Sequence, residues 1–220
     1  MIRLEKITKS YKTPSGRHYV FKDVDIEVPS GKSIGLIGRN GAGKSTLLNI
    51  IGGIDRPDRG RVVTNKRISW PVGLANGFQS SMTGRENVKF VARLYASKDE
   101  LADKVRFVAD FCDLGRFFDM PIRSYSTGMR ARLGFGLSMA FDFDYYVIDE
   151  VTAVGDAVFR KKGEALMESK RTVSQFIFVS HGLDEVSRLC DVGLLIGNGK
   201  VEYYSDVNEA IEVYKQENNV

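Results

Sequence analysis

The stretch GRNGAGKS, residues Gly38–Ser45, decides the fold of this chain. It matches the pattern G-x-x-x-x-G-K-[ST] at every fixed position, it follows the short apolar run 33–37, and a helical pattern begins at Lys44. The glycines let the backbone curl so that several N–H groups point inward, and the start of a helix adds a partial positive charge. This order of strand, loop and helix predicts a loop that binds nucleotide phosphates.

The side chains of this loop have separate expected roles. Lys44 is expected to reach the β- and γ-phosphates and to take part in catalysis, and the Ser45 hydroxyl to coordinate Mg²⁺. The predicted nucleotide contacts of the loop are Gly38, Arg39, Asn40, Gly41, Ala42, Gly43, Lys44, Ser45 and Thr46.

Two carboxylates follow a second apolar run. The run 145–148 is typical of a buried parallel strand, and Asp149 and Glu150 come directly after it. Open α/β sheets bind ligands at the carboxyl ends of their strands. We therefore expect Asp149 to hold Mg²⁺ through water, and Glu150 to orient or deprotonate the water that attacks the phosphate.

The remaining pattern indicates an α/β core that is interrupted by helices. Strand-like runs lie at 2–7, 24–28, 176–179, 192–196 and 201–204, and helical patterns lie at 159–168, 183–189 and 207–214. From Glu86 to Ala140 the pattern is almost entirely helical. We expect a nucleotide-binding core with an inserted helical block at about 81–143.

Composition excludes several other classes of protein. Of the 220 residues 43% are hydrophobic and 27% are charged, which argues against disorder, and the net charge of +4 does not demand a nucleic-acid partner. Cys112 and Cys190 lie far apart without metal-ligand spacing, as in a reducing compartment. The longest uncharged stretch, 68–84, contains proline, glycine and amide residues and is not expected to span a bilayer.

Further motifs follow these two in a specific order. Gln79 precedes the helical block, Ser126-Thr127-Gly128 lies before the acidic pair, Asp156 follows the pair, and His181 follows the run 176–179. Together with the phosphate loop, this order resembles the nucleotide-binding subunit of an ABC transporter over essentially the whole chain. The resemblance implies a P-loop NTPase (RecA-like) core, an N-terminal antiparallel β subdomain and an inserted helical subdomain in a single ABC ATPase domain, 1–220. Residues 1–80 and 144–220 would form the β subdomain and core, and 81–143 the helical subdomain.

The resemblance also implies roles for these residues. Gln79 is similar to the glutamine that senses Mg²⁺ and water near the membrane partner, and Ser126 and Gly128 to the signature residues that contact a γ-phosphate. The usual signature, Leu-Ser-Gly-Gly-Gln, departs here at Tyr125, Thr127 and Met129. Because the serine and the second glycine are kept, we expect the phosphate contact to survive, whereas Met129 puts a ribose contact in doubt.

Three more positions take their roles from the same resemblance. His181 is similar to the switch histidine that contacts the γ-phosphate during catalysis, and Asp156 to the D-loop aspartate. Tyr11 is similar to the aromatic residue that stacks on adenine, with Tyr19 as the competing candidate. ATP and Mg²⁺ are the implied cofactors. An ATP-dependent homodimer is implied, in which the signature of one chain contacts the ATP of the other.

Several segments resemble a subfamily, the ATP-binding subunits of bacterial capsular-polysaccharide exporters. They are 16–21, 51–57, 69–73, 83–88, 125–129 and 149–156. This resemblance implies a peripheral protein on the cytoplasmic face of the inner membrane, with two ATPase and two permease copies, periplasmic and outer-membrane export components beyond the permease, and no nucleic acid. Because the chain stops at Val220, we expect no appended carbohydrate-binding domain of the kind that O-antigen exporters often carry.

Other functions compete with this interpretation. A soluble ABC ATPase that acts on nucleic acid or ribosomes usually has two fused halves or a long coiled-coil insertion, and the helical block shows no sustained heptads. An O-antigen or teichoic-acid exporter is a closer alternative. A P-loop kinase or GTPase is disfavoured, because the guanine-reading Asn-Lys-x-Asp motif is missing.

Overall fold

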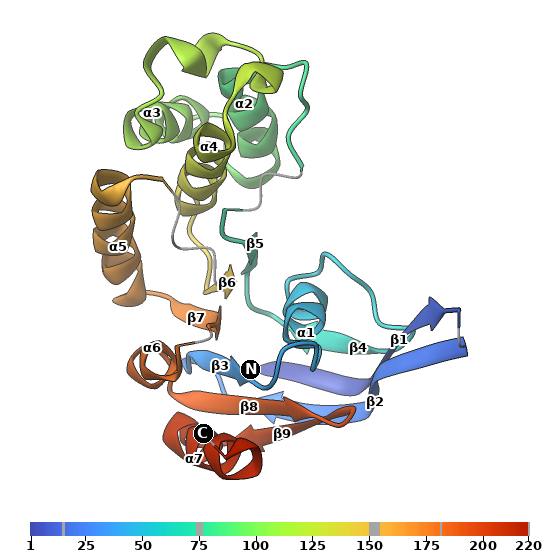
Figure 1. The fold of residues 1–220 in the computed structure, drawn as a ribbon. Coiled ribbons are helices and arrows are strands. Elements are labelled where there is room, and N and C mark those ends of the chain that lie inside the picture. The colour runs from blue at the N-terminus through green and yellow to red at the C-terminus, as the bar shows by residue number, and fades with distance from the viewer. Residues whose placement is uncertain (15, 74–76, 150–154, 181, 220) are drawn as a thin grey trace. The chain divides into compact units, whose positions relative to one another are not determined.

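The computed structural model describes residues 1–14, 16–73, 77–149, 155–180 and 182–219. The chain divides into two compact units. The core unit comprises Met1–Trp70, Phe143–Glu150 and Arg171–Val220, and the helical unit comprises Pro71–Asp142 and Val151–Lys170. Figure 1 labels the elements of both units.

The core unit holds the strands, with β5 ending at its boundary. Its strands are β1 Ile2–Thr13, β2 Gly16–Val28, β3 Ile34–Ile37, β4 Arg59–Thr64, β5 Ile68–Pro71, β6 Tyr145–Asp149, β7 Gln175–Val179, β8 Val192–Gly197 and β9 Lys200–Tyr204. In the described ranges they form a three-stranded sheet with order β2-β1-β4 and a six-stranded sheet with order β5-β6-β7-β3-β8-β9. The first sheet is antiparallel, whereas β6, β7, β3 and β8 run parallel and β9 is antiparallel to β8.

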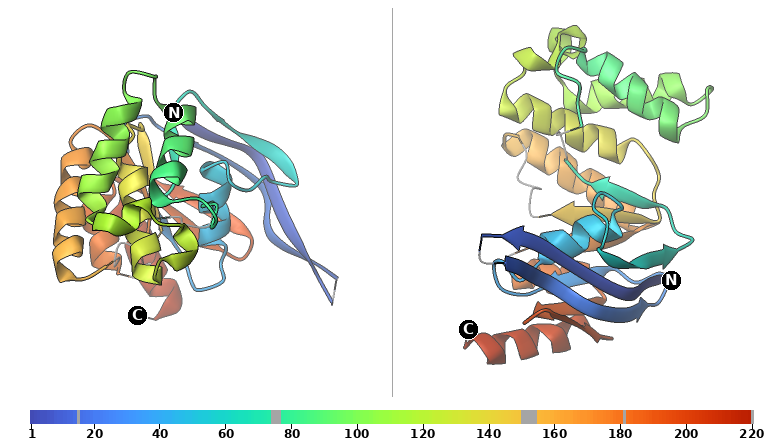
Figure 2. Two further views of the ribbon diagram at one scale, coloured as in Figure 1. Left: turned by 90° about the horizontal axis from the view of Figure 1, so that it is seen from above. Right: turned by 90° about the vertical axis from the view of Figure 1, so that its right-hand side faces the viewer.

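Helices cover the six-stranded sheet because its parallel strands β3, β6, β7 and β8 are apolar and buried along almost their whole length. The core helices are α1 Lys44–Ile51, α6 Leu183–Leu189 and α7 Val207–Asn218. On one face, α6 and α7 come close because Gly35 and Gly193 have no side chain, and an added Cβ would collide with Val186 or Ala210. The chain ends with α7 beside β8 (Figures 1 and 2). On the other face, α1 and the antiparallel sheet enclose the main hydrophobic core.

The helical unit has an aromatic centre. Its elements are α2 Gly84–Tyr95, α3 Leu101–Cys112, the 3-10 helices η1 Gly115–Asp119 and η2 Ile122–Ser124, α4 Thr127–Met139 and α5 Ala157–Arg171. The Phe111 ring stacks on Phe135 at 5.7 Å between centroids, and the Phe159 ring packs edge-on against Phe111 at 5.3 Å. Such aromatic pairs stabilise a core beyond the area that they bury. Within the described ranges, no helix combines the length and the apolar character that crossing a bilayer requires.

Two features differ from the expectations. The unit that contains the block 81–143 begins already at Pro71 and also includes α5, because Phe159 belongs to the aromatic centre. The first two strands are longer than the runs 2–7 and 24–28 and form one hairpin, in which Tyr11 pairs with His18. The last helix begins at Val207, as the helical pattern 207–214 predicts, and the Asp206 carboxylate caps it by accepting from Asn208 N at 2.8 Å.

Candidate functional site

The phosphate loop connects β3 to α1 and has the backbone geometry that its glycines predict. Gly41 and Gly43 have φ angles of 80° and 107°, which residues with a Cβ rarely adopt. A Cβ at Gly43 would also collide with Val20 and Phe21 of β2. The loop therefore packs tightly against the antiparallel sheet while its backbone curls at the start of α1.

The Lys44 ammonium bends back over this loop. Its Nζ donates to the carbonyl oxygens of Gly38 at 2.6 Å and of Arg39 at 3.1 Å. The loop is braced further by the bond from Ala42 N to Arg39 O, at 3.1 Å. The carbonyl bonds place the positive charge of Lys44 at the loop itself, where a phosphate would meet it.

The loop and the predicted acidic residue open into the same hollow. This hollow has a volume of about 320 Å³ and is lined by Asn40, Gly41, Gly43, Lys44, Ser45, Thr46, Asp149 and Val179. Asp149 reaches it from the end of β6, next to β7, which in turn pairs with β3. A hydroxyl and a carboxylate are oxygen donors of the kind that Mg²⁺ takes together with phosphate oxygens, so Ser45 and Asp149 fit this ion.

A second hollow of the core unit shares Gly41 with the first. It has a volume of about 500 Å³ and is lined by His18, Tyr19, Val20, Lys22, Gly41, Ala42, Asn198, Gly199 and Lys200. Tyr19 is half-exposed here, and Lys22 Nζ lies 4.4 Å from the centre of its ring. The Tyr11 hydroxyl, by contrast, bonds to Asp55 at 3.2 Å. Tyr11 is exposed as well, with Lys9 Nζ 5.2 Å from the centre of its ring, so adenine stacking by Tyr11 or by Tyr19 stays a prediction.

The signature residues lie in the helical unit at the start of α4. The Ser126 Oγ accepts from Met129 N at 3.2 Å and thereby caps this helix. Gly128 is exposed, and an added Cβ there would meet, among described atoms, only Ser126 Oγ within 4 Å. The open backbone at this helix start suits a phosphate that approaches from outside the unit.

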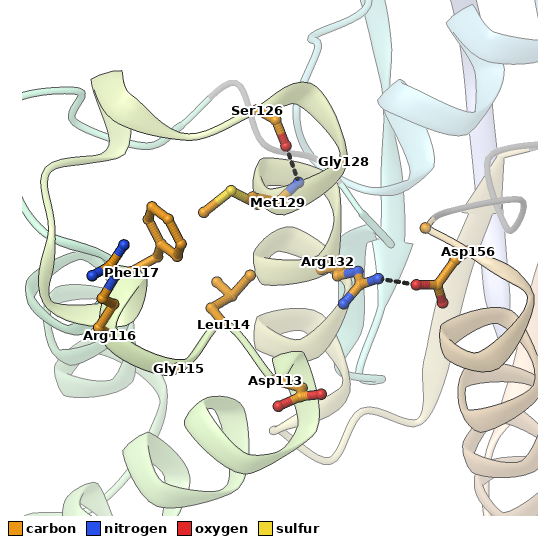
Figure 3. Close-up of a pocket in the computed structure, with 11 residues that line it drawn as sticks. Asp113, Leu114, Gly115, Arg116, Phe117, Ser126, Gly128, Met129, Arg132 and Asp156 are labelled. Carbon is orange, nitrogen blue, oxygen red and sulfur yellow. Dashed lines mark hydrogen bonds and ion pairs between the residues drawn. The ribbon is translucent and has the colours of Figure 1, made fainter.

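Ser126, Gly128 and Asp156 line one hollow of about 780 Å³ (Figure 3). Figure 3 shows the Arg132 side chain extending from α4 toward Asp156, and its Nη2 lies 2.6 Å from Asp156 Oδ2. The other Asp156 oxygen accepts from Phe159 N at 2.9 Å. That backbone hydrogen bond and, after it, the Arg132 charge hold the pKa of Asp156 below its ordinary value of 3.8. The aspartate is thus ionised and fixed within its own chain.

Tyr125, the first departure from the usual signature, has a structural role. Its side chain is buried, and its hydroxyl donates to Phe117 O at 2.6 Å. It packs onto Gly84 in the first turn of α2, where a Cβ would collide with the hydroxyl. Burial raises its pKa to about 12, so the hydroxyl stays a neutral donor.

Gln79 also belongs to the helical unit, and its side chain is exposed. Its backbone is hydrogen-bonded to buried Asn87 of α2, a residue that sequence reasoning missed. Arg132 was missed as well. The signal for Asn87 was its amide on a helix whose neighbouring positions Val88, Val91 and Ala92 are apolar. The predicted catalytic residues Glu150 and His181 lie outside the described residues.

Comparisons with known proteins agree with this geometry. A model of the ABC transporter family matches residues 21–153. The chain is 62% identical to the polysialic acid transport ATP-binding protein KpsT of Escherichia coli, over 98% of this chain and 96% of that protein. It is 38% identical to the capsule polysaccharide export ATP-binding protein CtrD of Neisseria meningitidis serogroup B, over 97% and 98%. The dimeric, ADP- and Pi-bound structure of the ATP-binding cassette MJ0796 has the same fold, with a TM-score of 0.75 and 22% identity over 94% of this chain and 99% of that one.

Proposed function

This chain belongs to the ABC transporter family of ATPases, and from that premise we propose that it powers the export of a lipid-linked capsular polysaccharide across the inner membrane. The observation that carries the ATPase part is the 320 Å³ hollow that the phosphate loop shares with Asp149. The similarity to KpsT and CtrD over nearly the whole chain supports the choice of cargo.

The nucleotide is expected to bind by its phosphates in this hollow. Backbone N–H groups of the loop and the Lys44 ammonium bind the β- and γ-phosphates and stabilise the charge that develops as the γ-phosphate leaves. Ser45 and Asp149, with Gln79, would hold Mg²⁺, which neutralises phosphate charge when bound. Glu150 orients or deprotonates the attacking water, and His181 contacts the γ-phosphate.

The active unit is proposed to be an ATP-dependent homodimer. Ser126 and Gly128 at the open start of α4 would contact the γ-phosphate that the other chain holds, because a helix N-terminus favours an anion. Asp156 would contribute to the same closed site. The dimeric state of the MJ0796 cassette supports this arrangement for a chain of the same fold.

A membrane partner completes the proposal. Two ATPase chains would bind two copies of a permease and lie peripherally on the cytoplasmic face of the inner membrane, with periplasmic and outer-membrane export components beyond the permease. In this arrangement ATP hydrolysis would reopen the dimer and move the permease.

The proposal is tested by Lys44→Ala in a strain whose own capsule ATPase gene is deleted. The wild-type chain should restore surface polymer, and Lys44→Ala should not. ATP turnover of the purified transporter should fall by roughly 10²–10³ or more, because a charge opposite the phosphates is lost. Near-normal turnover contradicts the phosphate-loop assignment. If Lys44→Ala loses ATP turnover as expected but the wild-type chain does not restore surface polymer, the choice of cargo is contradicted.

A further inference from the structure

Asn87 of α2 connects this helix to the loop that carries Gln79. Asn87 is 4% exposed, and its side-chain amide has four hydrogen-bond contacts. Asn87 Oδ1 accepts from Gln79 N at 2.8 Å, and Nδ2 donates to Gln79 O at 3.1 Å. Nδ2 also lies 3.3 Å from Met82 O and 2.9 Å from Thr83 O. One buried side chain thus binds both backbone groups of Gln79.

We propose that Asn87 is a positioning residue for Gln79. By holding the N–H and the C=O of the Gln79 backbone, Asn87 fixes the point from which the exposed Gln79 side chain extends. The inference rests on the proposed function, in which Gln79 contacts Mg²⁺ and water. Residues that orient the ligands of a site act in this way without touching substrate themselves.

The start of α2 does not need Asn87 for its own capping. Thr83 and Glu86 form a complete capping box: Glu86 N donates to Thr83 Oγ1, and Thr83 N donates to Glu86 Oε2. A buried amide is unfavourable unless its hydrogen bonds are made, and two of the bonds of Asn87 go to a residue eight positions earlier. Capping of α2 therefore leaves the two bonds from Asn87 to the Gln79 backbone unexplained, and these bonds carry the inference.

The turn that Asn87 holds is also bonded to the segment before the signature. Met82 N donates to Gln79 O at 3.1 Å, which closes the turn. Ile122 N donates to Met82 O, and Arg123 N donates to Ser80 O, both at 3.0 Å. The turn therefore has hydrogen bonds on two sides, with Asn87 of α2 and with Ile122 and Arg123. Both of the latter residues lie shortly before Ser126. A side chain attached to such a turn has a defined origin, and loss of Asn87 should affect turnover more than nucleotide affinity.

The test is a double-mutant cycle on the full chain, with Asn87→Ala, Gln79→Ala and the double variant. We expect Asn87→Ala to lower kcat by roughly tenfold, the lower range for residues that orient the ligands of a site, and to leave KM for ATP within about twofold. In the Gln79→Ala background, Asn87→Ala should lower kcat no further. Hydrogen exchange of the Gln79 amide should become at least about tenfold faster in Asn87→Ala, because its acceptor is gone.

Ser138→Ala is the matched control. Ser138 is a fully buried polar residue of the same unit, and its hydroxyl donates to Gly134 O at 2.9 Å on α4. It should leave kcat and the exchange of the Gln79 amide unchanged. If Asn87→Ala does not fold, Asn87→Asp replaces it, because this variant keeps the acceptor for Gln79 N and loses the donors. We again expect it to lower kcat in the otherwise wild-type chain and to have no effect on kcat in the Gln79→Ala background.

The outcomes separate this inference from the proposed function. A kcat in the double variant that falls by the product of the two single effects shows a merely structural role and overturns the inference. Wild-type turnover in the Asn87 variants, beside a clear loss in Gln79→Ala, overturns the inference alone. Wild-type turnover in Gln79→Ala overturns the proposed role of Gln79, and with it the role of Asn87.

Discussion

The hollow at the phosphate loop and the hollow at the signature are built in different ways. The first is lined mainly by neighbouring residues of the phosphate loop and the start of α1, with Asp149 added from β6 and Val179 from β7. The second combines three separate segments, 113–117, 126–132 and 155–156. The phosphate loop is therefore visible in the sequence as one continuous motif, whereas the hollow at the signature also depends on residues such as Leu114 and Arg132, which no motif names.

The sharpest test of this comparison asks whether the two hollows face each other across two chains. Cys112 and Cys190, both buried, are first replaced by alanine. One chain then carries Asn40→Cys and the other Ser126→Cys, each with Glu150→Gln so that ATP persists. With ATP and Mg²⁺, oxidation should yield a mixed cross-link as the main product, because a disulfide needs Cα atoms within about 7 Å. The yield is read on a non-reducing gel. A mixed product no more abundant than the two self-products contradicts the composite site.

A Cβ at Gly43 should destroy the backbone-built hollow. Gly43→Ala combines a φ of 107° with a collision at Val20 and Phe21. We expect a loss of about 2–4 kcal/mol in the free energy of unfolding and ATP binding weakened by roughly 100-fold, measured by denaturation and nucleotide titration.

Gly53→Ala is the control for backbone strain alone. Gly53 has a φ of 73°, and an added Cβ meets no described atom within 4 Å. Gly53→Ala should lower the free energy of unfolding by about 1–2 kcal/mol and leave ATP affinity unchanged. Equal ATP affinity in Gly43→Ala and the wild type would show that the loop does not need its packing against β2.

Tyr125→Phe tests the side-chain support of the signature hollow. It removes the bond from the Tyr125 hydroxyl to Phe117 O and should lower the free energy of unfolding by about 1–2 kcal/mol. Turnover should stay within about twofold, because the variant keeps the ring that packs on Gly84. Chemical denaturation and an ATPase assay check both values. Unchanged stability together with lost turnover would assign Tyr125 to the chemistry instead.

The smallest expected effect is a pH dependence at Asp156. The pKa of Asp156 is lowered in the folded chain by the Phe159 N–H and then by Arg132, so its carboxylate contributes stability above the ordinary pKa of 3.8. This contribution to stability is lost as the pH falls through the pKa of Asp156 in the folded chain, which lies below 3.8. Asp156→Asn should be less stable than the wild type at pH 5–7, and the difference should vanish in acid. A difference that grows as pH falls below about 4 contradicts this assignment.

Sequence predicted the parts of the fold that local chemistry determines. The apolar runs at β6, β7 and β8 mark strands buried on both faces, and α1 begins at Lys44 as the phosphate loop requires. β4 was missed because the segment Arg59–Thr64 begins with Arg-Gly-Arg and is partly exposed, so it lacks a clear apolar pattern. β4 forms by pairing with β1, which lies far away along the chain, and a local pattern does not reveal such pairing.

The candidate site divides in the same way. Asn40, Lys44, Ser45 and Asp149 were predicted to act together, and they line one hollow. Asn87 and Arg132 were missed because their partners lie 8 and 24 positions away along the chain. The choice between Tyr11 and Tyr19 for adenine stacking stays a prediction, and the structure adds that Tyr19 lines a hollow that shares Gly41 with the phosphate loop.

The order of the segments bears on how this chain folds during synthesis. The core unit is interrupted twice, after Trp70 and after Glu150, and the helical unit is made of two separate segments. Domains commonly fold as units while the ribosome still adds residues. Here the helical unit lacks α5 until residue 170 has emerged, and the six-stranded sheet lacks β7, β8 and β9 until later still. A nascent chain that ends at the acidic pair would therefore contain the phosphate loop and the signature, yet neither unit in finished form, and would expose the apolar faces of β3 and β6 to chaperones.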